Sequence, residues 1–420
     1  MSQQPPLRRA MGGFDATTVG IGAMIGAGAF VVLAPAAAAA GALLPLAIVI
    51  AGVVAYCNAS ATASLAVRYP SSGGTYVYGR EQLGHWAGFL AGWSFVTGKL
   101  ASCAAMALTF GLYAAPGAGK AAAVAAVVGL TVVNLLGVTR TAIATRVIVS
   151  LVVPVIAFVI VVAFSAPPVQ DTGAVAPGGA GGVLQASALL FFAFAGYARI
   201  ATMGEEVRNP RRNIPLAILG ALGFTLVLYL LLGVSLLRAL GPAGLAEATA
   251  PLRDVFDAAV PGEGSMGRGG AVVTLAAALA SLGALLALIA GVGRTSLAMA
   301  RGRDLPRVLA RVSRRYGVPW IADIATAVVV VVLLLTTDVL TVVGFSSFGV
   351  LLYYAIANIA AFTLPERQWY APRWLNAIGA LACLVLAFTL PTTSVVTMLV
   401  VLGVGLAGRA AVLARRRARG

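Results

Sequence analysis

A glycine-rich stretch near the N-terminus holds the first groups that could do chemistry. Four glycines, at positions 20, 22, 26 and 28, lie in the apolar segment Gly20–Ile21–Gly22–Ala23–Met24–Ile25–Gly26–Ala27–Gly28–Ala29–Phe30. Glycine lowers helix stability by about 1 kcal/mol relative to alanine, so the segment predicts an interrupted helix. The amide and carbonyl groups exposed by an interruption suit a carboxylate and an ammonium group respectively. Small residues also mark close helix packing, and the glycines alone leave both interpretations open.

A second interruption is predicted in the segment Phe191–Phe192–Ala193–Phe194–Ala195–Gly196–Tyr197–Ala198–Arg199, where a glycine lies among aromatic residues and a charge follows. This segment begins the second half of a series of apolar runs that the first segment opens. Paired breaks at corresponding positions of two halves are typical of transporters built from inverted repeats, because broken backbone in a membrane is tolerated where it lines a cavity. The pair therefore favours a transport site.

Two cations lie inside apolar runs, where a charge costs at least a few kcal/mol. Lys99 is a candidate proton carrier, because a desolvated lysine gives up its proton more readily; alternatively it binds backbone carbonyls at a helix break. Arg199 cannot titrate usefully. It attracts a substrate carboxylate, reaches Glu205 or Glu206 as a gate, or extends to the inner surface. The sequence leaves these alternatives open.

The residue types needed for catalysis or metal binding are scarce. His85 is the single histidine, and the three cysteines, Cys57, Cys103 and Cys383, have no metal-ligand spacing. No carboxylate lies at the depth of the two cations, so a membrane enzyme is disfavoured. A channel would need a selectivity ring, and no candidate is present. We expect no catalytic residue, no metal site and no cofactor.

The elements that must position these groups are apolar helices. The chain is 60% hydrophobic and 10% charged, whereas soluble chains carry about 25% charged residues; lipid must therefore be part of its solvent. A bilayer span needs about 20 apolar residues. Twelve such runs are present, over residues 14–40, 42–66, 86–114, 121–137, 146–166, 184–204, 214–240, 269–298, 320–337, 339–363, 374–390 and 392–413. The sequence predicts an all-α integral membrane protein of about twelve transmembrane helices.

The basic residues indicate the orientation across the membrane. With the N-terminus in the cytoplasm, most arginines lie inside, and the basic residues outside are Lys120, Arg238, Arg253 and Arg268, as the positive-inside rule requires. The basic residues that give the net charge of +16 lie between the apolar runs, so nucleic acid is not an expected partner. We expect the first run to be retained, not cleaved as a signal. The 27 arginines beside two lysines suggest a bacterial chain, so we expect the inner membrane and cytoplasmic termini.

Four motifs in order make the chain resemble the amino acid–polyamine–organocation (APC) superfamily of permeases. They are the first glycine segment, residues 191–196 followed by 205–215, the loop 69–76, and residues 298–301 with 305–306. The resemblance covers nearly the whole chain and implies a LeuT-like 5+5 inverted repeat with discontinuous helices 1 and 6. It implies a cytoplasmic segment over residues 1–13, a first repeat of helices 1–5 over residues 14–166 and a second repeat of helices 6–10 over residues 184–363. Two peripheral helices over residues 374–413 and a basic cytoplasmic tail over residues 414–420 would follow.

The resemblance also assigns substrate-binding residues, which lie in the two interruptions: Met24, Ile25, Gly26, Ala27, Gly28, Phe192, Phe194, Ala195 and Gly196. It implies that the carbonyls of Met24 and Ala195 accept from a substrate ammonium group. The amides of residues 26–28 would receive its carboxylate, and Phe192 occupies the position of the family's aromatic gate. Lys99, Arg199, Glu205 and Glu206 are the candidates for proton coupling or gating.

The substrate and the coupling ion follow from departures from the family. Basic-substrate and polyamine branches often carry an acidic residue where this chain has Ala198, so a neutral L-amino acid is expected and an acidic one stays open. Gly283 and Ala284 stand where a sodium site would need hydroxyl groups, which favours proton coupling or exchange. An exporter, a polyamine or amine transporter and a non-transporting nutrient sensor are the alternatives. The oligomeric state and the direction of transport are left open.

Overall fold

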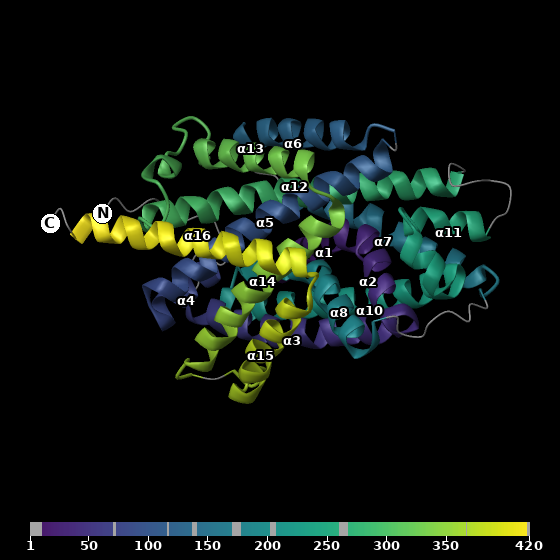
Figure 1. Cartoon of the computed structure of the whole chain (residues 1–420), viewed down its shortest axis with the longest axis horizontal. Helices are drawn as coiled ribbons and strands as arrows, with labels where there is room; N and C mark the ends of the chain where they lie inside the picture. The colour runs from purple at the N-terminus through teal and green to yellow at the C-terminus, as the bar shows by residue number, and fades with distance from the viewer. Residues whose placement is uncertain are drawn as a thin grey trace.

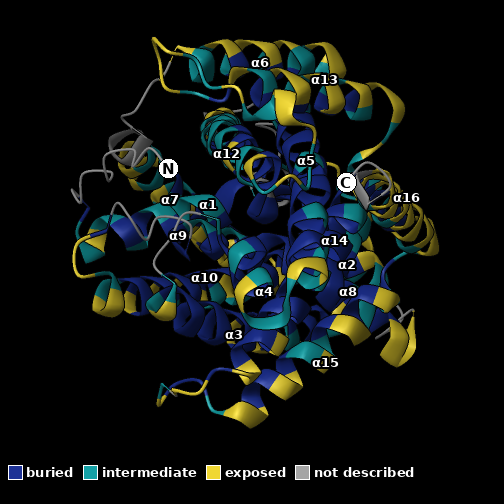
Figure 2. Ribbon diagram, turned by 90° about the vertical axis from the view of Figure 1, so that its left-hand side faces the viewer, coloured by how far each residue is buried: buried dark blue, intermediate teal, exposed yellow. Residues whose placement is uncertain are grey.

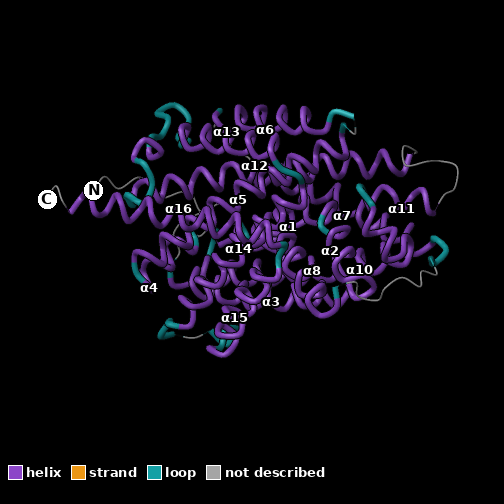
Figure 3. The backbone as a smooth tube through the Cα atoms, viewed as in Figure 1, coloured by secondary structure: helices purple, strands orange, loops and turns teal. Residues whose placement is uncertain are grey.

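The computed structural model describes residues 11–69, 73–115, 117–136, 141–169, 178–201, 207–259, 268–366 and 368–417. In these ranges the chain consists of helices, loops and turns without a strand, and Met11 and Val207 form one isolated bridge. Figure 3 shows how much of the described backbone is helical. The prediction of an all-α chain is confirmed for this part of the protein.

Nine segments of the described ranges are long and apolar enough to cross a membrane. The helices that form them are α1 (Gly13–Val31), α2 (Leu33–Ala40), η1 (Gly41–Leu43), α3 (Leu44–Arg68), α5 (His85–Ala114), α7 (Thr141–Ser165), α8 (Gly179–Phe194), η2 (Ala195–Tyr197), α9 (Ala198–Ala201), α10 (Pro210–Glu247), α12 (Arg268–Arg301), α14 (Val339–Phe362) and α16 (Thr392–Arg417). The chain is therefore a multi-pass membrane protein.

Three further apolar helices are 17 residues long: α6 (Gly119–Leu135), α13 (Trp320–Thr336) and α15 (Arg373–Thr389). Each of the twelve predicted runs overlaps at least one helix of these two groups. Three short elements lie outside the twelve predicted runs and connect the longer helices: α4 (Thr75–Leu83), α11 (Pro251–Ala259) and η3 (Arg307–Ala310).

The helix ends follow local chemistry. Pro210 opens α10, where its fixed φ suits the first turn and its missing N–H is not needed. Asp338 caps α14 by accepting a hydrogen bond from the Thr341 amide at 2.8 Å, which satisfies one of the free donors of the first turn. Gly241, at φ 71°, bends α10 near its end, because glycine adopts positive φ without steric strain.

The helices form a buried centre with exposed outer members. Figure 2 shows dark, buried ribbon on α1, α5, α8, α10 and α14, and more exposed surface on α6, α13 and α16. The outer helices expose large apolar side chains, among them Val400 and Val404 of α16 and Val328 and Leu335 of α13. Apolar surface of this extent suits contact with lipid.

The two ends of the molecule differ in what they contain. Both termini, α4 and the C-terminal end of α12 gather at the left-hand end of Figure 1, and α11 lies at the opposite end. Between these ends α5 packs against α12 and α14, and α1 packs against α10 and α12. The Ser102 and Ser346 hydroxyls form a hydrogen bond of 2.6 Å between α5 and α14, which fixes the rotation of α5 and therefore the direction of its polar side chains.

Candidate functional site

The helix α1 is interrupted at Gly26. This residue has φ −35° and ψ −138°, outside the helical range, although α1 continues on both sides. A Cβ atom here would lie 2.7 Å from Cβ of Ala284 in α12 and 3.0 Å from Sδ of Met106 in α5. Both interpretations of the glycine therefore apply: it interrupts the helix, and it lets Ala284 and Met106 approach the backbone closely.

The second segment changes geometry where the sequence predicted it. Regular α-helix ends at Phe194, a 3₁₀ turn spans Ala195–Tyr197, and α9 follows. The turn lies directly on the backbone of α1, since a Cβ at Gly196 would overlap the Ala23 carbonyl group and the Met24 nitrogen. A Cβ at Gly28 would likewise lie 2.6 Å from Cα of Ala193. The two irregular segments thus cross in backbone contact.

Tyrosine hydroxyls reach two carbonyl groups at this crossing. Tyr229 of α10 donates to the Met24 carbonyl at 2.8 Å, and Tyr354 of α14 donates to the Ala195 carbonyl at 3.5 Å. These are the carbonyls expected to accept from a substrate ammonium group. A carbonyl oxygen has two lone pairs, so the tyrosine bond alone does not saturate either carbonyl. Sequence reasoning missed both tyrosines, which no local motif marks.

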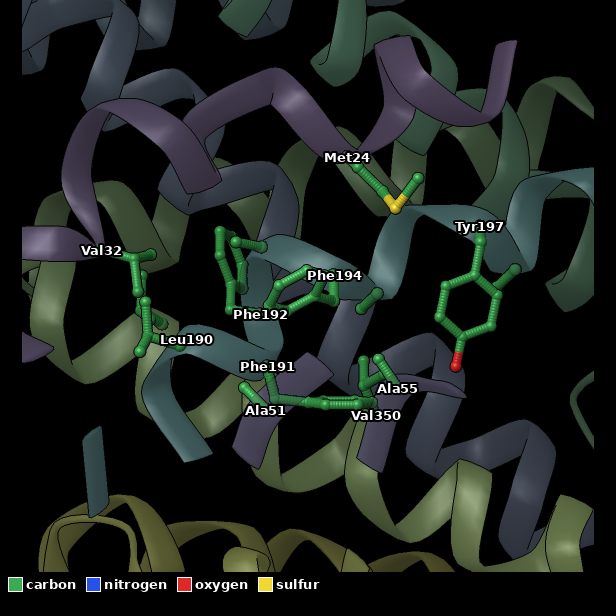
Figure 4. Packing of buried hydrophobic residues seen from close by; sticks show 14 of the residues in the cluster. Met24, Val32, Ala51, Ala55, Leu190, Phe191, Phe192, Phe194, Tyr197 and Val350 are labelled. Atoms are coloured by element: carbon green, nitrogen blue, oxygen red, sulfur yellow. The ribbon is translucent and has the colours of Figure 1, made fainter. Parts of the chain in front are cut away.

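Aromatic packing surrounds the same crossing. Phe194 lies edge-on to Tyr229, with ring centroids 5.3 Å apart, and Phe191 meets Tyr354 at 5.7 Å. Figure 4 shows Phe191 pointing toward Ala51, Ala55 and Val350, away from Met24. The phenylalanines of α8 therefore hold its last turn against α3, α10 and α14.

A cavity begins beside the crossing. It encloses about 910 Å³, counting space open to solvent, and its walls come from α1, α5, the α8–α9 segment and α12. Five of the predicted residues line it: Lys99, Phe192, Ala195, Gly196 and Arg199. Sequence reasoning did not predict the remaining wall, which includes Ala23, Phe95, Ser102, Met106, Leu288 and Arg294. The structure therefore brings the second interruption and both predicted cations to one space.

Other predicted residues lie beside this space and do not line it. Met24, Ile25 and Phe194 are buried, and Gly26 contacts the cavity wall through Met106 and Ala284. Gly28 lies against α8. The side chain of Ala27 and the residues Glu205 and Glu206 lie outside the described part of the chain.

The electrostatics of the cavity are one-sided. Lys99 is 7% exposed, and within the described residues its ammonium group has neither a carboxylate at ion-pairing distance nor a hydrogen-bond acceptor. Arg199 and Arg294 belong to the same wall, and none of the lining residues is acidic. Burial of a charge is tolerated when a partner compensates it, so the cavity suits a ligand that brings a negative group to Lys99.

The cavity extends toward one end of the molecule. Gly73, which precedes α4, and Arg294 and Thr295, in the last turns of α12, belong to its wall. In Figure 1 these elements lie at the end that holds both termini. In the described ranges, no three His, Cys, Asp or Glu residues form a group that could hold a metal ion.

Comparison with known proteins agrees with this arrangement. A family model described as "Amino acid permease" matches residues 11–406. The chain is 52% identical over 410 residues to an uncharacterized transporter of Mycobacterium tuberculosis, covering 96% of this chain and 90% of that protein. It is 27% identical to a branched-chain amino acid permease of Bacillus subtilis, over 96% and 93% of the two chains. A methylthioribose transporter of the same bacterium is 26% identical, over 87% and 83%.

Proposed function

The chain belongs to the amino acid permease family, and we propose that it is a secondary active transporter that moves neutral L-amino acids by alternating access. One observation carries the proposal. Two irregular helical segments cross in backbone contact beside a cavity, and the cavity wall holds the buried ammonium group of Lys99, which has no partner among the described residues. A zwitterion supplies the missing negative group and also an ammonium group for the carbonyls nearby.

The substrate would bind with its carboxylate toward Lys99. Its ammonium group would approach the Ala195 carbonyl, where the Tyr354 hydrogen bond of 3.5 Å is long enough to yield. Phe95, Met106 and Phe192 form an apolar wall for the side chain. This arrangement disfavours polyamines, because the buried ammonium group of Lys99 lines the cavity and none of the lining residues is acidic. It is compatible with the branched-chain substrate named for one relative.

The proposal includes the architecture needed for alternating access. We take the twelve apolar helices as two inverted repeats, residues 14–166 and 184–363, with 374–413 as two peripheral helices between cytoplasmic segments 1–13 and 414–420. The two irregular segments then stand at corresponding positions of the repeats, as in other transporters of this kind. With both termini in the cytoplasm of a bacterial cell, the end of the cavity that lies toward the termini faces inward.

Lys99 is the proposed coupling group. An ammonium group that pairs with the substrate carboxylate stays charged while substrate is bound. It can release a proton when the site empties and the amine is left unpaired in an apolar wall. Proton-linked transport and exchange of one amino acid for another are both compatible with this cycle. Arg199, with Glu205 and Glu206 just beyond α9, is proposed as the gate on the cytoplasmic side.

The test combines binding and flux. Purified protein is screened by thermal shift against the L-amino acids and common amines, and each hit is tested for counterflow in liposomes. Lys120→Met is the matched control for Lys99→Met, because Lys120 is the other lysine of the chain and is exposed.

We expect a neutral amino acid to stabilise the protein and to drive counterflow that Lys99→Met abolishes and Lys120→Met preserves. Binding without counterflow would identify a sensor and overturn the transporter proposal. Stabilisation by polyamines alone would overturn the role given to Lys99.

A further inference from the structure

A second hollow lies outside the proposed substrate site. It encloses about 1860 Å³, counting open space, and runs between the beginning of α5, the C-terminal half of α16 and the loop after α12. It shares no lining residue with the central cavity. One wall is apolar, with Trp86, Phe89 and Trp93 on α5 facing Val404 and Val412 on α16. We refer to this hollow as the α5–α16 groove.

The α5–α16 groove contains a buried arginine. Arg409 of α16 is 9% exposed, and its Nη2 lies 3.1 Å from Oδ1 of Asp304. Its guanidinium carbon lies 4.8 Å and 4.6 Å from the ring centroids of Trp86 and Phe89, within the range of cation–π attraction. Its Nε and Nη1 atoms have no hydrogen-bond partner among the described residues. The arginine is thus held in place while two of its buried donors have no protein partner among the described residues.

The single acid of the groove is fully engaged. Asp304 pairs with Arg409 and with Arg80 at 3.7 Å, and it accepts a hydrogen bond of 2.9 Å from the Tyr76 hydroxyl. Burial, followed by the charge of Asp304, raises the pKa of Tyr76 to about 12, so this hydroxyl keeps its proton at neutral pH. Asp304 therefore cannot neutralise the other basic residues of the rim.

The charge of the groove is positive. Four arginines, Arg80, Arg303, Arg307 and Arg409, line it together with the one aspartate, Asp304, and His85. The groove therefore carries an excess of three positive charges when the histidine is neutral. Arg303 and Arg307 are exposed at the rim, where the chain leaves α12. An anion would find donors at the rim and an apolar wall below it.

We propose that the α5–α16 groove binds an anionic phospholipid, with its phosphate group at Arg303, Arg307 and Arg409 and one acyl chain along the apolar wall. A soluble anion would use the rim and leave the wall of Trp86, Val404 and Val412 uncovered. Basic pockets between helices on the cytoplasmic side suit anionic headgroups, and tryptophan is enriched at the level of the headgroups. The proposal is independent of the substrate, because no residue of the central cavity takes part.

The position of the groove gives such a lipid a structural effect. Trp93 donates a hydrogen bond of 2.9 Å to the Val401 carbonyl, which fixes α16 to α5 at one end of the groove. At the other end the contact between α16 and the loop after α12 is the Arg409–Asp304 pair. A phosphate group bridging Arg307 and Arg409 would add a second connection there. Since α12 lines the central cavity, lipid binding would stiffen the end of a helix that the substrate contacts.

Two glycines of α16 provide a matched test. A Cβ atom at Gly408 would meet no atom within 4 Å, and the same holds at Gly403 on the same helix. Gly408 lines the groove and Gly403 does not. Gly408→Leu should therefore fill space proposed for the acyl chain without disturbing the fold, while Gly403→Leu adds the same side chain outside the groove.

The experiment measures lipid binding by native mass spectrometry and thermal shift in detergent. The probes are phosphatidylglycerol, phosphatidylcholine with the same acyl chains, and inorganic phosphate. We expect phosphatidylglycerol alone to bind and stabilise. Binding should weaken about tenfold or more in Gly408→Leu and in the double variant Arg303→Gln/Arg307→Gln, since each basic residue near anionic lipid contributes about fivefold.

Gly403→Leu and the charge-matched double variant Arg311→Gln/Arg314→Gln, at exposed arginines outside the groove, should keep the wild-type affinity. Equal losses in both double variants would indicate general attraction to a basic surface and overturn the proposal. Stabilisation by inorganic phosphate to the same extent would indicate a soluble anion, and equal binding of phosphatidylcholine would indicate an apolar seat only. Either result would overturn it as well.

Discussion

Lys99 and Arg409 are both cations buried in the apolar helices of this protein, yet their surroundings differ. Arg409 pairs with Asp304 at 3.1 Å and lies over two aromatic rings. Lys99 lies in the wall of the central cavity without a carboxylate at ion-pairing distance among the described residues. A buried charge requires compensation. The protein itself supplies a carboxylate to Arg409, whereas the proposed function leaves the compensation of Lys99 to the substrate.

The largest effect is expected at Lys99. Lys99→Met removes the charge and keeps the length, so the substrate should lose a charge-assisted hydrogen bond worth about 1.5–3 kcal/mol, or roughly 10- to 150-fold in affinity. The melting temperature without substrate should stay the same or rise, because an unpaired buried charge is replaced by an apolar chain. Thermal shift with and without the amino acid measures both. A variant that melts well below the wild type without substrate would show that Lys99 is structural, and the comparison would fail.

The opposite pattern is expected at Asp304. Asp304→Asn leaves Arg409 without its negative partner, and breaking a buried ion pair costs about 3–5 kcal/mol. The free energy of unfolding should fall by that order while the affinity for the amino acid stays within about twofold of the wild type. Asp338→Asn, at an exposed helix cap of α14, is the control and should be nearly neutral, because asparagine caps a helix about as well as aspartate. A loss of substrate affinity as large as that of Lys99→Met would contradict the separation of the two cations.

The sequence predicted much of the central site and little of what surrounds it. Three features of the site involve residue types that are costly in a lipid-embedded helix: the break at Gly26, the 3₁₀ turn at Gly196 and the cavity position of Lys99. Each can therefore be recognised from the local sequence. Tyr229 and Met24 are separated by 205 residues, and Tyr354 and Ala195 by 159. Such contacts depend on how the helices pack, and nothing in the sequence around a tyrosine of an apolar helix indicates which residue it will contact.

The ion pair of Asp304 and Arg409 is another contact between distant residues that the sequence does not predict. Asp304 lies in a segment recognised by its motif, and Arg409 was one more basic residue near the C-terminal end of an apolar run. The two residues meet because α16 packs against α5 beside the loop after α12, which no spacing in the sequence indicates. Glu205 and Glu206, by contrast, stay predictions, because they lie outside the described residues.

A smaller effect is expected where the two irregular segments touch. Gly196→Ala places a methyl group on the Ala23 carbonyl and the Met24 nitrogen, and overpacking of this kind costs about 1–3 kcal/mol. Because the wall of the cavity shifts with the backbone, counterflow should fall along with the melting temperature. Gly291→Ala is the control, since it also lines the cavity and its added Cβ meets no atom within 4 Å. Equal losses in both variants would show that the crossing itself has no special role.

The smallest effects are expected at the two tyrosines, and they test which carbonyl group accepts the substrate ammonium group. Tyr229→Phe removes a hydrogen bond of 2.8 Å to the Met24 carbonyl, and Tyr354→Phe removes a longer one of 3.5 Å to the Ala195 carbonyl. A typical hydrogen bond contributes about 0.5–1.5 kcal/mol to stability, so Tyr229→Phe should be destabilising and Tyr354→Phe nearly neutral. If the substrate ammonium group uses the Ala195 carbonyl, removal of its competitor should tighten binding about two- to fivefold, measured by titration calorimetry. Tighter binding in Tyr229→Phe instead would move the ammonium group to Met24, on the other irregular segment, and reverse the orientation of the substrate relative to Lys99.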